Sequence, residues 1–141
     1  MYQVMEPILQ GGDEVNHNHV ILVIDDDQAV RTSLKFTLEV EGFKVQAYSD
    51  ARELLNEVSL PPFSCLVIDY YLPEMNGLEL VAKLRNRHIS IPTILITTLP
   101  SKDLRDRAKA AGIRIVEKPL LGSCLLDSIR NALDEHTKAS S

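Results

Sequence analysis

The sequence predicts an α/β domain whose parallel β-sheet is covered by helices on both faces. Short, nearly continuous apolar runs alternate with segments whose apolar residues recur at helical spacing, and this strand–helix unit repeats about five times. Repetition of such units is typical of a parallel sheet. The chain of 141 residues, 45% of them hydrophobic, suits one domain with a sizeable core.

The apolar runs are the predicted strands, and there are five of them: Val20–Ile24, Lys44–Tyr48, Cys65–Ile68, Thr93–Thr97 and Ile113–Glu117. The second run is more polar than the rest and is expected at an edge of the sheet. In open parallel sheets the ligand site lies at the carboxyl ends of the strands. The residues that follow these runs are therefore the candidates for function.

The intervening segments carry the signals of helices. Apolar residues at helical spacing mark each of them: Val30, Leu34 and Leu38; Leu54, Leu55 and Val58; Leu80, Val81 and Leu84; Leu104, Ala108 and Ala111; and Leu125 or Leu126 with Ile129 and Leu133. Capping or helix-stopping residues lie at their ends: Gly42, Asp50 with Glu53, Asn76 with Glu79, Ser101 and Gly112. About five helices are therefore expected.

Both ends of the chain lack a sustained pattern. Residues 1–18 are predicted to form a flexible tail, residues 19–136 the folded domain, and residues 137–141 a short C-terminal tail. His17 and His19 near the first boundary could hold a metal, but a solvated segment is the favoured interpretation.

Composition excludes several classes of function. The net charge is −5 with no basic run, so direct binding of nucleic acid is not expected. The longest apolar run, Val20–Ile24, is too short to span a membrane, and the start of the chain lacks the basic residues of a secretory signal. Cys65 and Cys124 have no metal-site spacing and are expected to be buried thiols of a cytoplasmic protein.

Polar residues follow or close four of the predicted strands. They are Asp25, Asp26 and Asp27 after the first strand, Asp69 after the third, Thr97 and Thr98 at the fourth, and Lys118 with Pro119 after the fifth. Each has a structural explanation of its own, such as a helix cap for Asp27 or a turn toward Pro73 for Asp69. Their coincidence at one edge of one sheet favours a functional site instead.

This set of groups suits phosphoryl transfer onto a carboxylate. Converging carboxylates repel one another, and Mg²⁺ relieves the repulsion because it takes oxygen ligands. One carboxylate then attacks phosphorus and becomes an acyl phosphate. The metal and a lysine offset the charge of the transferred group, and a hydroxyl donates a hydrogen bond to it.

In these motifs the chain resembles the receiver domains of bacterial two-component response regulators, the CheY-like domains. The motifs are IDDD at residues 24–27, D-x-x-L-P-x-M-x-G at residues 69–77, Thr97, and E-K-P at residues 117–119. The resemblance covers about residues 19–136. It implies a flavodoxin-like, doubly wound sheet of five parallel strands in the order 2-1-3-4-5, with about five helices.

The resemblance also implies a metal site that holds Mg²⁺, or Mn²⁺ in its place. Asp69 is the phosphoacceptor by this resemblance and also a metal ligand. Asp26 binds the metal directly and Asp25 binds through a water, while the backbone carbonyl of Tyr71 completes the site. Gly77 fits a tight entry from the loop into the following helix, where a Cβ would crowd its neighbours.

On the phosphoryl side, the resemblance implies that Lys118 pairs with phosphoryl oxygens and that Thr97 and the backbone of Thr98 contact the same group. The bond between Lys118 and Pro119 is usually cis in this family. Receivers usually carry Phe or Tyr three residues before the lysine as the switching partner of the threonine, and Ile115 stands there instead. The signal is therefore expected to pass through shifts around residues 97–101 rather than through a rotating ring.

Other departures from the family pattern bear on function. Tyr71 and Leu99 lie two residues past Asp69 and Thr97, where the family tunes loss of the phosphoryl group. A ring and an apolar chain are expected to obstruct water and to slow autodephosphorylation. Leu120 either packs in the core or lies exposed on the face of the fourth helix, fifth strand and fifth helix, the usual partner surface.

The expected function is that of a receiver in a two-component phosphorelay. It accepts a phosphoryl group on Asp69 from a histidine kinase or a histidine phosphotransfer protein, and it signals to a downstream protein or forms a homodimer through that partner surface. It is expected to catalyse only its own phosphorylation and dephosphorylation. The alternative is the receiver half of a DNA-binding transcription regulator whose output domain lies outside this chain.

Two further classes are disfavoured. Haloacid-dehalogenase-like phosphatases also use an aspartyl nucleophile with Mg²⁺, but they need a second acid two residues later, where this chain has Tyr71. A receiver that has lost phosphorylation would lack one or more of the key side chains, yet all of them are present: Asp25, Asp26, Asp69, Thr97 and Lys118.

Overall fold

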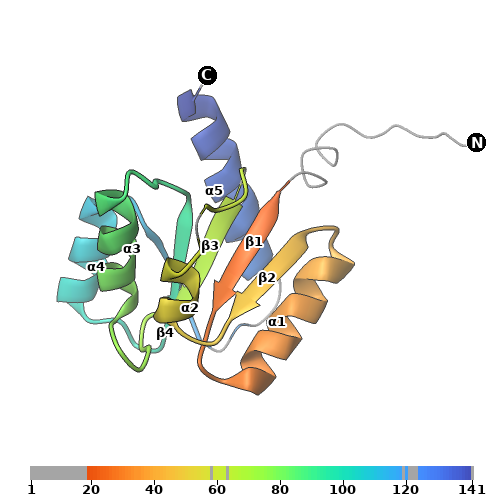
Figure 1. Ribbon diagram of the computed structural model, residues 1–141. Helices are drawn as coiled ribbons and strands as arrows, with labels where there is room; N and C mark the ends of the chain where they lie inside the picture. Colours follow the sequence, from red (N-terminus) through yellow and green to blue (C-terminus); the bar gives the residue numbers. More distant parts are fainter. Residues whose placement is uncertain (1–18, 58, 63, 119, 121–123, 141) are drawn as a thin grey trace, which may run out of the picture.

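The computed structural model describes residues 19–57, 59–62, 64–118, 120 and 124–140 (Figure 1). Within them, parallel strands form one five-stranded sheet in the order β2-β1-β3-β4-β5. The strands are β1 (Val20–Ile24), β2 (Lys44–Tyr48), β3 (Ser64–Asp69), β4 (Thr93–Thr97) and β5 (Arg114–Glu117). The helices are α1 (Gln28–Val40), α2 (Ala51–Leu55), α3 (Gly77–Asn86), α4 (Lys102–Ala110) and α5 (Cys124–Ser140). The predicted fold class and strand order are confirmed.

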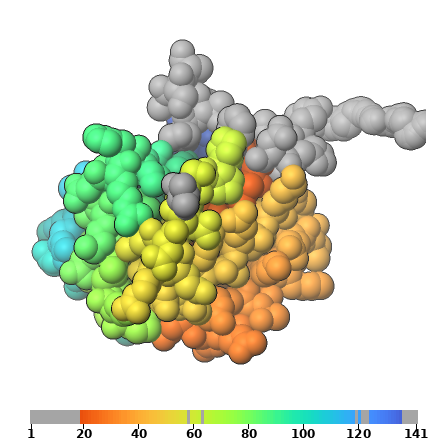
Figure 2. Space-filling view, viewed as in Figure 1, coloured from red at the N-terminus to blue at the C-terminus, as the bar shows by residue number. Residues whose placement is uncertain are grey.

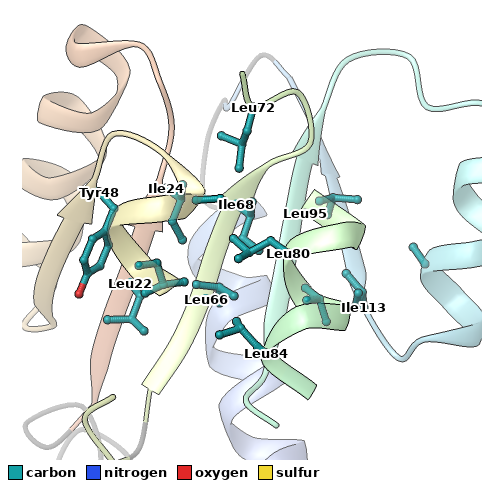
Figure 3. Close-up of a cluster of buried hydrophobic side chains, with 14 of the residues drawn as sticks. Leu22, Ile24, Tyr48, Leu66, Ile68, Leu72, Leu80, Leu84, Leu95 and Ile113 are labelled. Atoms are coloured by element: carbon teal, nitrogen blue, oxygen red, sulfur yellow. The ribbon is translucent and has the colours of Figure 1, made fainter. Parts of the chain in front are cut away.

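The sheet separates two hydrophobic cores. Leu22 and Ile24 of β1 join the core under α2, α3 and α4, whereas Ile21 and Val23 join the core under α1 and α5. Figure 3 shows the first core, where the strand side chains meet Leu80 of α3. Because helices cover both faces, the inner strands are apolar at successive positions, which explains their continuous apolar runs.

The polar strand β2 lies at one edge of the sheet, as its composition predicted. Among the described strands it pairs with β1 alone, in the register Ile24 to Tyr48 at its carboxyl end. In the space-filling view it reaches the surface between α1, in orange, and α2, in yellow (Figure 2). The first residue of this strand, Lys44, is exposed, and a lysine on an edge disfavours pairing with another chain.

Side chains predicted to cap helices close four of the helix N-termini. In each case a backbone N–H of the first turn donates to the side chain of the residue before the helix: Asp27 for α1, Asp50 for α2, Asn76 for α3 and Ser101 for α4. The predicted capping box of Asn76 and Glu79 is complete. At Asp50, the side chain accepts from the N–H of Glu53, and the Glu53 carboxylate accepts hydrogen bonds from the N–H and hydroxyl of Ser49.

The structure differs from the sequence predictions near the chain ends. Helix α5 continues to Ser140, past residue 136, and no glycine or proline interrupts this segment. Cys124, at the start of α5, is exposed, so the prediction that it is buried is wrong. Cys65 is buried as predicted, and burial raises the pKa of its thiol to about 12. His19, assigned to a solvated segment, is instead buried just before β1.

Val58, predicted to lie on the second helix, falls outside the described residues. Among the helices that the structure describes, none is both long enough and apolar enough to cross a membrane.

Candidate functional site

Three carboxylates meet at the carboxyl ends of β1 and β3. Each of Asp25, Asp26 and Asp69 offers an oxygen, and these oxygens all lie within 4.8 Å of one another. The pairing of Ile24 with Ile68 in adjacent parallel strands is what places the acids side by side. Asp25 and Asp69 are 2% and 7% exposed, whereas Asp26 is open to solvent. The sequence prediction that these acids converge agrees with this geometry.

The electrostatic environment of Asp25 disfavours its charged form. Burial raises the pKa of Asp25 above its usual value, and the nearby charges of Asp69 and Asp26 raise it further. The hydrogen bond that the backbone N–H of Asp27 donates to Asp25 Oδ1 (2.9 Å) and the charge of Lys118 act in the opposite direction. The balance leaves an excess of negative charge at this edge of the sheet.

Lys118 brings a cation to the acids from β5, on the other side of β4. Its Nζ lies 3.1 Å from Asp69 Oδ2. Its backbone N–H donates to the carbonyl of Thr97 (2.9 Å), which continues the pairing between β4 and β5. The side chain is partly exposed, so the ion pair remains open to a ligand from solvent.

The loop after β3 fixes the other oxygen of the Asp69 carboxylate. The backbone N–H of Tyr71 donates to Asp69 Oδ1 at 3.1 Å. The N–H of Tyr70 donates to Ile96, and the carbonyl of Tyr70 accepts from Gly77, so the loop is tied to both β4 and α3. Tyr71 thus contacts Asp69 through its backbone, in the segment where a carbonyl ligand is predicted.

Thr97 lies at the end of β4 and is 1% exposed. Its hydroxyl donates to the carbonyl of Thr98 at 3.4 Å rather than to a site carboxylate. Thr98 is exposed beside it. The two residues therefore lie at the end of β4, and the Thr97 hydroxyl is directed toward the backbone of the next residue.

The residues predicted to flank the acceptor lie at the surface. Tyr71 is 66% exposed and its ring meets Tyr70 edge to face, with centroids 4.8 Å apart. Leu99 is 90% exposed and has a backbone φ of 40°, in the left-handed region. Both side chains therefore lie at the surface, in the loops that follow β3 and β4.

The remaining predictions concern the strand β5 region. Ile115 is partly buried and packs against the core under α2, α3 and α4. Leu120 is partly buried and packs against the core under α1 and α5, so the core alternative holds for it. Pro119, predicted to follow a cis bond, and Leu121 lie outside the described residues.

Sequence reasoning did not single out one residue that contacts the site. Arg31 of α1 is partly buried, and its Nη1 donates to the backbone carbonyl of Asp25 at 2.7 Å. The available signal was an arginine one turn after the predicted cap Asp27, on the side of the helix that faces the sheet edge. Spacing alone does not distinguish such a residue from a solvated one.

The donor set fits a hard divalent cation. Carboxylate oxygens from β1 and β3 converge, and one of the acids, Asp25, is buried with a raised pKa. Binding of a cation stabilises the charged carboxylates of such a site. Nitrogen and sulfur ligands, which softer metals prefer, do not take part in this cluster of described residues. Mg²⁺ suits an all-oxygen site that keeps some of its waters.

Comparison with known proteins adds independent information. A family model described as the response regulator receiver domain matches residues 21–130. The chain is 36% identical over 115 residues to the C4-dicarboxylate transport transcriptional regulatory protein DctD of Pseudomonas aeruginosa, which covers 81% of this chain and 25% of that protein. It is 32% identical over 124 residues to the transcriptional regulatory protein FixJ of Rhizobium meliloti, which covers 87% and 60%. The chain therefore spans less than two thirds of these relatives.

Solved structures agree with the sequence comparison. A CheY-like response regulator receiver domain protein from Methanospirillum hungatei superposes with a TM-score of 0.77 at 32% identity, over 86% of this chain and 98% of that one. The structure of FixJ-N superposes with a TM-score of 0.75 at 31% identity, over 82% and 94%. By its sequence, its strand order and its fold, the chain belongs to the family of response regulator receiver domains.

Proposed function

We propose that this chain is a receiver of a two-component phosphorelay and that Asp69 is its phosphoacceptor. The arrangement around Asp69 carries the proposal: Lys118 Nζ lies 3.1 Å from one of its oxygens, and the oxygens of Asp25 and Asp26 lie within 4.8 Å. A carboxylate nucleophile, a cation and a pair of metal-ligating acids are the parts that phosphoryl transfer to a carboxylate needs. Membership in the receiver family supports the same reading.

In the proposed reaction an Asp69 oxygen attacks the phosphorus of a phosphohistidine. The new O–P bond forms as the P–N bond breaks, and the histidine nitrogen leaves with the electron pair of that bond. Lys118, now paired with Asp69, transfers its hydrogen bond to a phosphoryl oxygen. The Thr97 hydroxyl turns from the Thr98 carbonyl to the same group.

Asp25, Asp26, Asp69 and the Tyr71 carbonyl are proposed to hold Mg²⁺, or Mn²⁺ in its place. When bound, the cation offsets negative charge on the phosphoryl group and on the three acids. In its absence the repulsion among the acids is opposed by Lys118, whose charge lowers the pKa of Asp25.

The proposed partners are a histidine kinase or histidine phosphotransfer protein as donor and a protein as target, in the cytoplasm. The face formed by α4, β5 and α5 is the proposed contact surface for the target or for a second copy of the chain. Ion pairs join its elements, Arg105 with Glu117 (2.7 Å) and Arg114 with Glu135 (2.5 Å). Their charged groups are partly exposed and can be exchanged for partner contacts.

The proposal is tested by incubating the protein with acetyl phosphate and Mg²⁺ and weighing it intact. We expect a gain of one phosphoryl group that is lost in Asp69→Asn and in the presence of a chelator. Asp27→Asn is the matched control, because Asn also caps helices and Asp27 lies next to the metal-ligating pair without belonging to it. Absence of any gain in the wild type, or a full gain in Asp69→Asn, contradicts the proposal.

A second candidate is the receiver half of a DNA-binding transcription regulator. The observation that favours it is that the chain spans only part of relatives named as transcriptional regulatory proteins. Reading the coding sequence downstream of Ser141 distinguishes the two, since a helix-turn-helix domain there supports the regulator and a stop codon supports the stand-alone receiver.

A further inference from the structure

Arg31 is the charged residue of α1 that folds back onto the end of β1. Its backbone N–H takes part in the first helical bond, to the carbonyl of Asp27 at 3.0 Å. Its side chain extends past the start of the helix, and Nη1 donates to the carbonyl of Asp25 at 2.7 Å. The guanidinium is therefore held against the strand end while the residue itself belongs to the helix.

This hydrogen bond completes the fixation of Asp25. The N–H of Asp25 donates to the carbonyl of Tyr48 (3.2 Å), and its carboxylate accepts from the N–H of Asp27 (2.9 Å). The carbonyl that Arg31 binds belongs to the peptide group that joins Asp25 to Asp26. Because that peptide group is planar, fixing its oxygen fixes the direction in which the chain enters Asp26.

Asp26 has no comparable support from burial. It is exposed, whereas Asp25 and Asp69 are packed at the sheet edge. An exposed carboxylate that must meet two buried ones depends on its backbone for direction. Groups that orient metal ligands typically change metal affinity about 10- to 100-fold when they are removed.

The charge of Arg31 also reaches Glu53 of α2, where it is one of several smaller effects on the pKa. Hydrogen bonds from the hydroxyl and N–H of Ser49 hold the pKa of Glu53 below its usual value, and the charge of Arg31 adds to this effect. The charges that shift the pKa of Asp25 are those of Asp69, Lys118 and Asp26. Arg31 thus reaches the acid cluster through a backbone carbonyl, on the side that faces α2.

We infer that Arg31 is a positioning residue of the divalent-cation site: by holding the carbonyl of Asp25, it presents Asp26 to the cation together with Asp25 and Asp69. This inference rests on the proposed function, in which the three acids hold a divalent cation. The positioning role of Arg31 raises the affinity for the cation, whereas its charge lowers that affinity, because a guanidinium near a cation site repels the cation. The sign of the effect of removing Arg31 therefore distinguishes the two.

The test measures Mn²⁺ binding by electron paramagnetic resonance and Mg²⁺ binding by calorimetry, with no phosphoryl donor present. We expect Arg31→Met to raise the dissociation constant about tenfold. Arg31→Gln, whose amide is too short to reach the carbonyl, is expected to do the same, and Arg31→Lys is expected to recover part of the loss. Arg130→Met is the control, since Arg130 of α5 pairs with Glu41 away from the acid cluster.

The dependence on ionic strength distinguishes an effect of the Arg31 hydrogen bond from an effect of the Arg31 charge. The weakening is expected to persist between about 0.01 M and about 1 M salt, because the Debye length falls roughly tenfold over that range while a backbone hydrogen bond remains. Hydrogen exchange of the metal-free protein is expected to show faster exchange at the amide of Asp27, which donates to Asp25, in Arg31→Met than in Arg130→Met.

Equal or tighter cation binding by both Arg31→Met and Arg31→Gln overturns the inference. The two variants guard against a failure of either one to fold, which circular dichroism detects. A wild type that binds neither cation contradicts the proposed function as well. A wild type that binds normally beside unaffected Arg31 variants contradicts the role of Arg31 alone.

Discussion

The acids that follow β1 differ in what surrounds each of them. Asp25 is buried and held by backbone groups, while Asp26 faces solvent. Asp27 accepts hydrogen bonds from the N–H groups of Ala29 (2.9 Å) and Val30 (3.2 Å) and caps α1, as the structural interpretation of this residue predicted. Three identical residues in a row thus have three different environments.

Tyr71 and Leu99 are the residues whose predicted effect is kinetic. We expect Tyr71→Asn and Leu99→Glu each to speed loss of the phosphoryl group about tenfold, or about 1.4 kcal/mol in the barrier, because each replaces a group expected to obstruct water by one that orients it. Both side chains are exposed, so neither change disturbs the core. The measurement is the decay of the phosphorylated mass after the donor is removed.

Val40→Asn is the control for this series, since Val40 is also an exposed apolar residue and lies at the end of α1. Decay rates that stay at the wild-type value in both Tyr71→Asn and Leu99→Glu contradict the prediction that these residues obstruct water.

At the level of the elements, the connection from β3 to α3 leaves no room for a side chain at Gly77. Gly77 is the first residue of α3, and a Cβ on it would lie 2.5 Å from Leu95 Cδ1 and 3.3 Å from Ile68 Cγ2. Its N–H donates to Tyr70 (2.9 Å), which keeps the loop short and close to Asp69. The crowding predicted at Gly77 from the motif agrees with these distances.

We expect Gly77→Ala to lower the free energy of unfolding by about 1 to 3 kcal/mol, because an added methyl group in a packed core forces side chains to move. Chemical denaturation measures the change. In a Leu95→Val background, which shortens the side chain that the methyl meets, the loss is expected to be smaller. An equal loss in both backgrounds would show that the contact with Leu95 is not the cause.

The loop from β4 to α4 also departs from a relaxed conformation. Leu99 has a φ of 40°, which costs a residue with a side chain roughly 1 to 2 kcal/mol. The loop begins at Thr97 and ends at Ser101, the cap of α4. This is the segment in which the sequence predicts switching without an aromatic ring, and a strained loop is suited to change conformation.

In the whole molecule, like charges repel one another at the edge of the sheet where the carboxyl ends of the strands lie. Parallel strands end on one side, so acids from β1 and β3 and a lysine from β5 meet there. Burial together with the charges of Asp69 and Asp26 raises the pKa of Asp25. The folded protein therefore binds a proton at Asp25 more readily than the unfolded chain does.

The sign of the pH dependence follows from this shift. The contribution of Asp25 to stability is full below the pKa of 3.8 that the free carboxyl has, and it is lost as the pH rises through the higher pKa of the folded state. At neutral pH in a chelator we expect Asp25→Asn to be more stable than the wild type in urea, with the difference disappearing in acid. Added Mg²⁺ is expected to stabilise the wild type more than the variant.

A metal-free Asp25→Asn protein that is less stable than the wild type at neutral pH would contradict this account. Asp106→Asn is the control, because Asp106 is an exposed acid of α4 that pairs with Lys102.

The sequence by itself determined the fold class and the identity of the acidic residues at the sheet edge. The spacing of apolar residues distinguishes strands from helices locally. Because the carboxyl ends of parallel strands lie at the same edge of the sheet, the sequence alone could place Asp25, Asp26, Asp69 and Lys118 together. Their family motifs added the strand order.

Only the tertiary structure decided which groups those residues contact. That Arg31 turns back to Asp25, that Leu120 joins the core and that Cys124 is exposed all depend on distances between segments far apart in the chain or on the direction of one side chain. Periodicity places a residue on an element, but the partner of a side chain is selected by packing, which the local pattern does not contain.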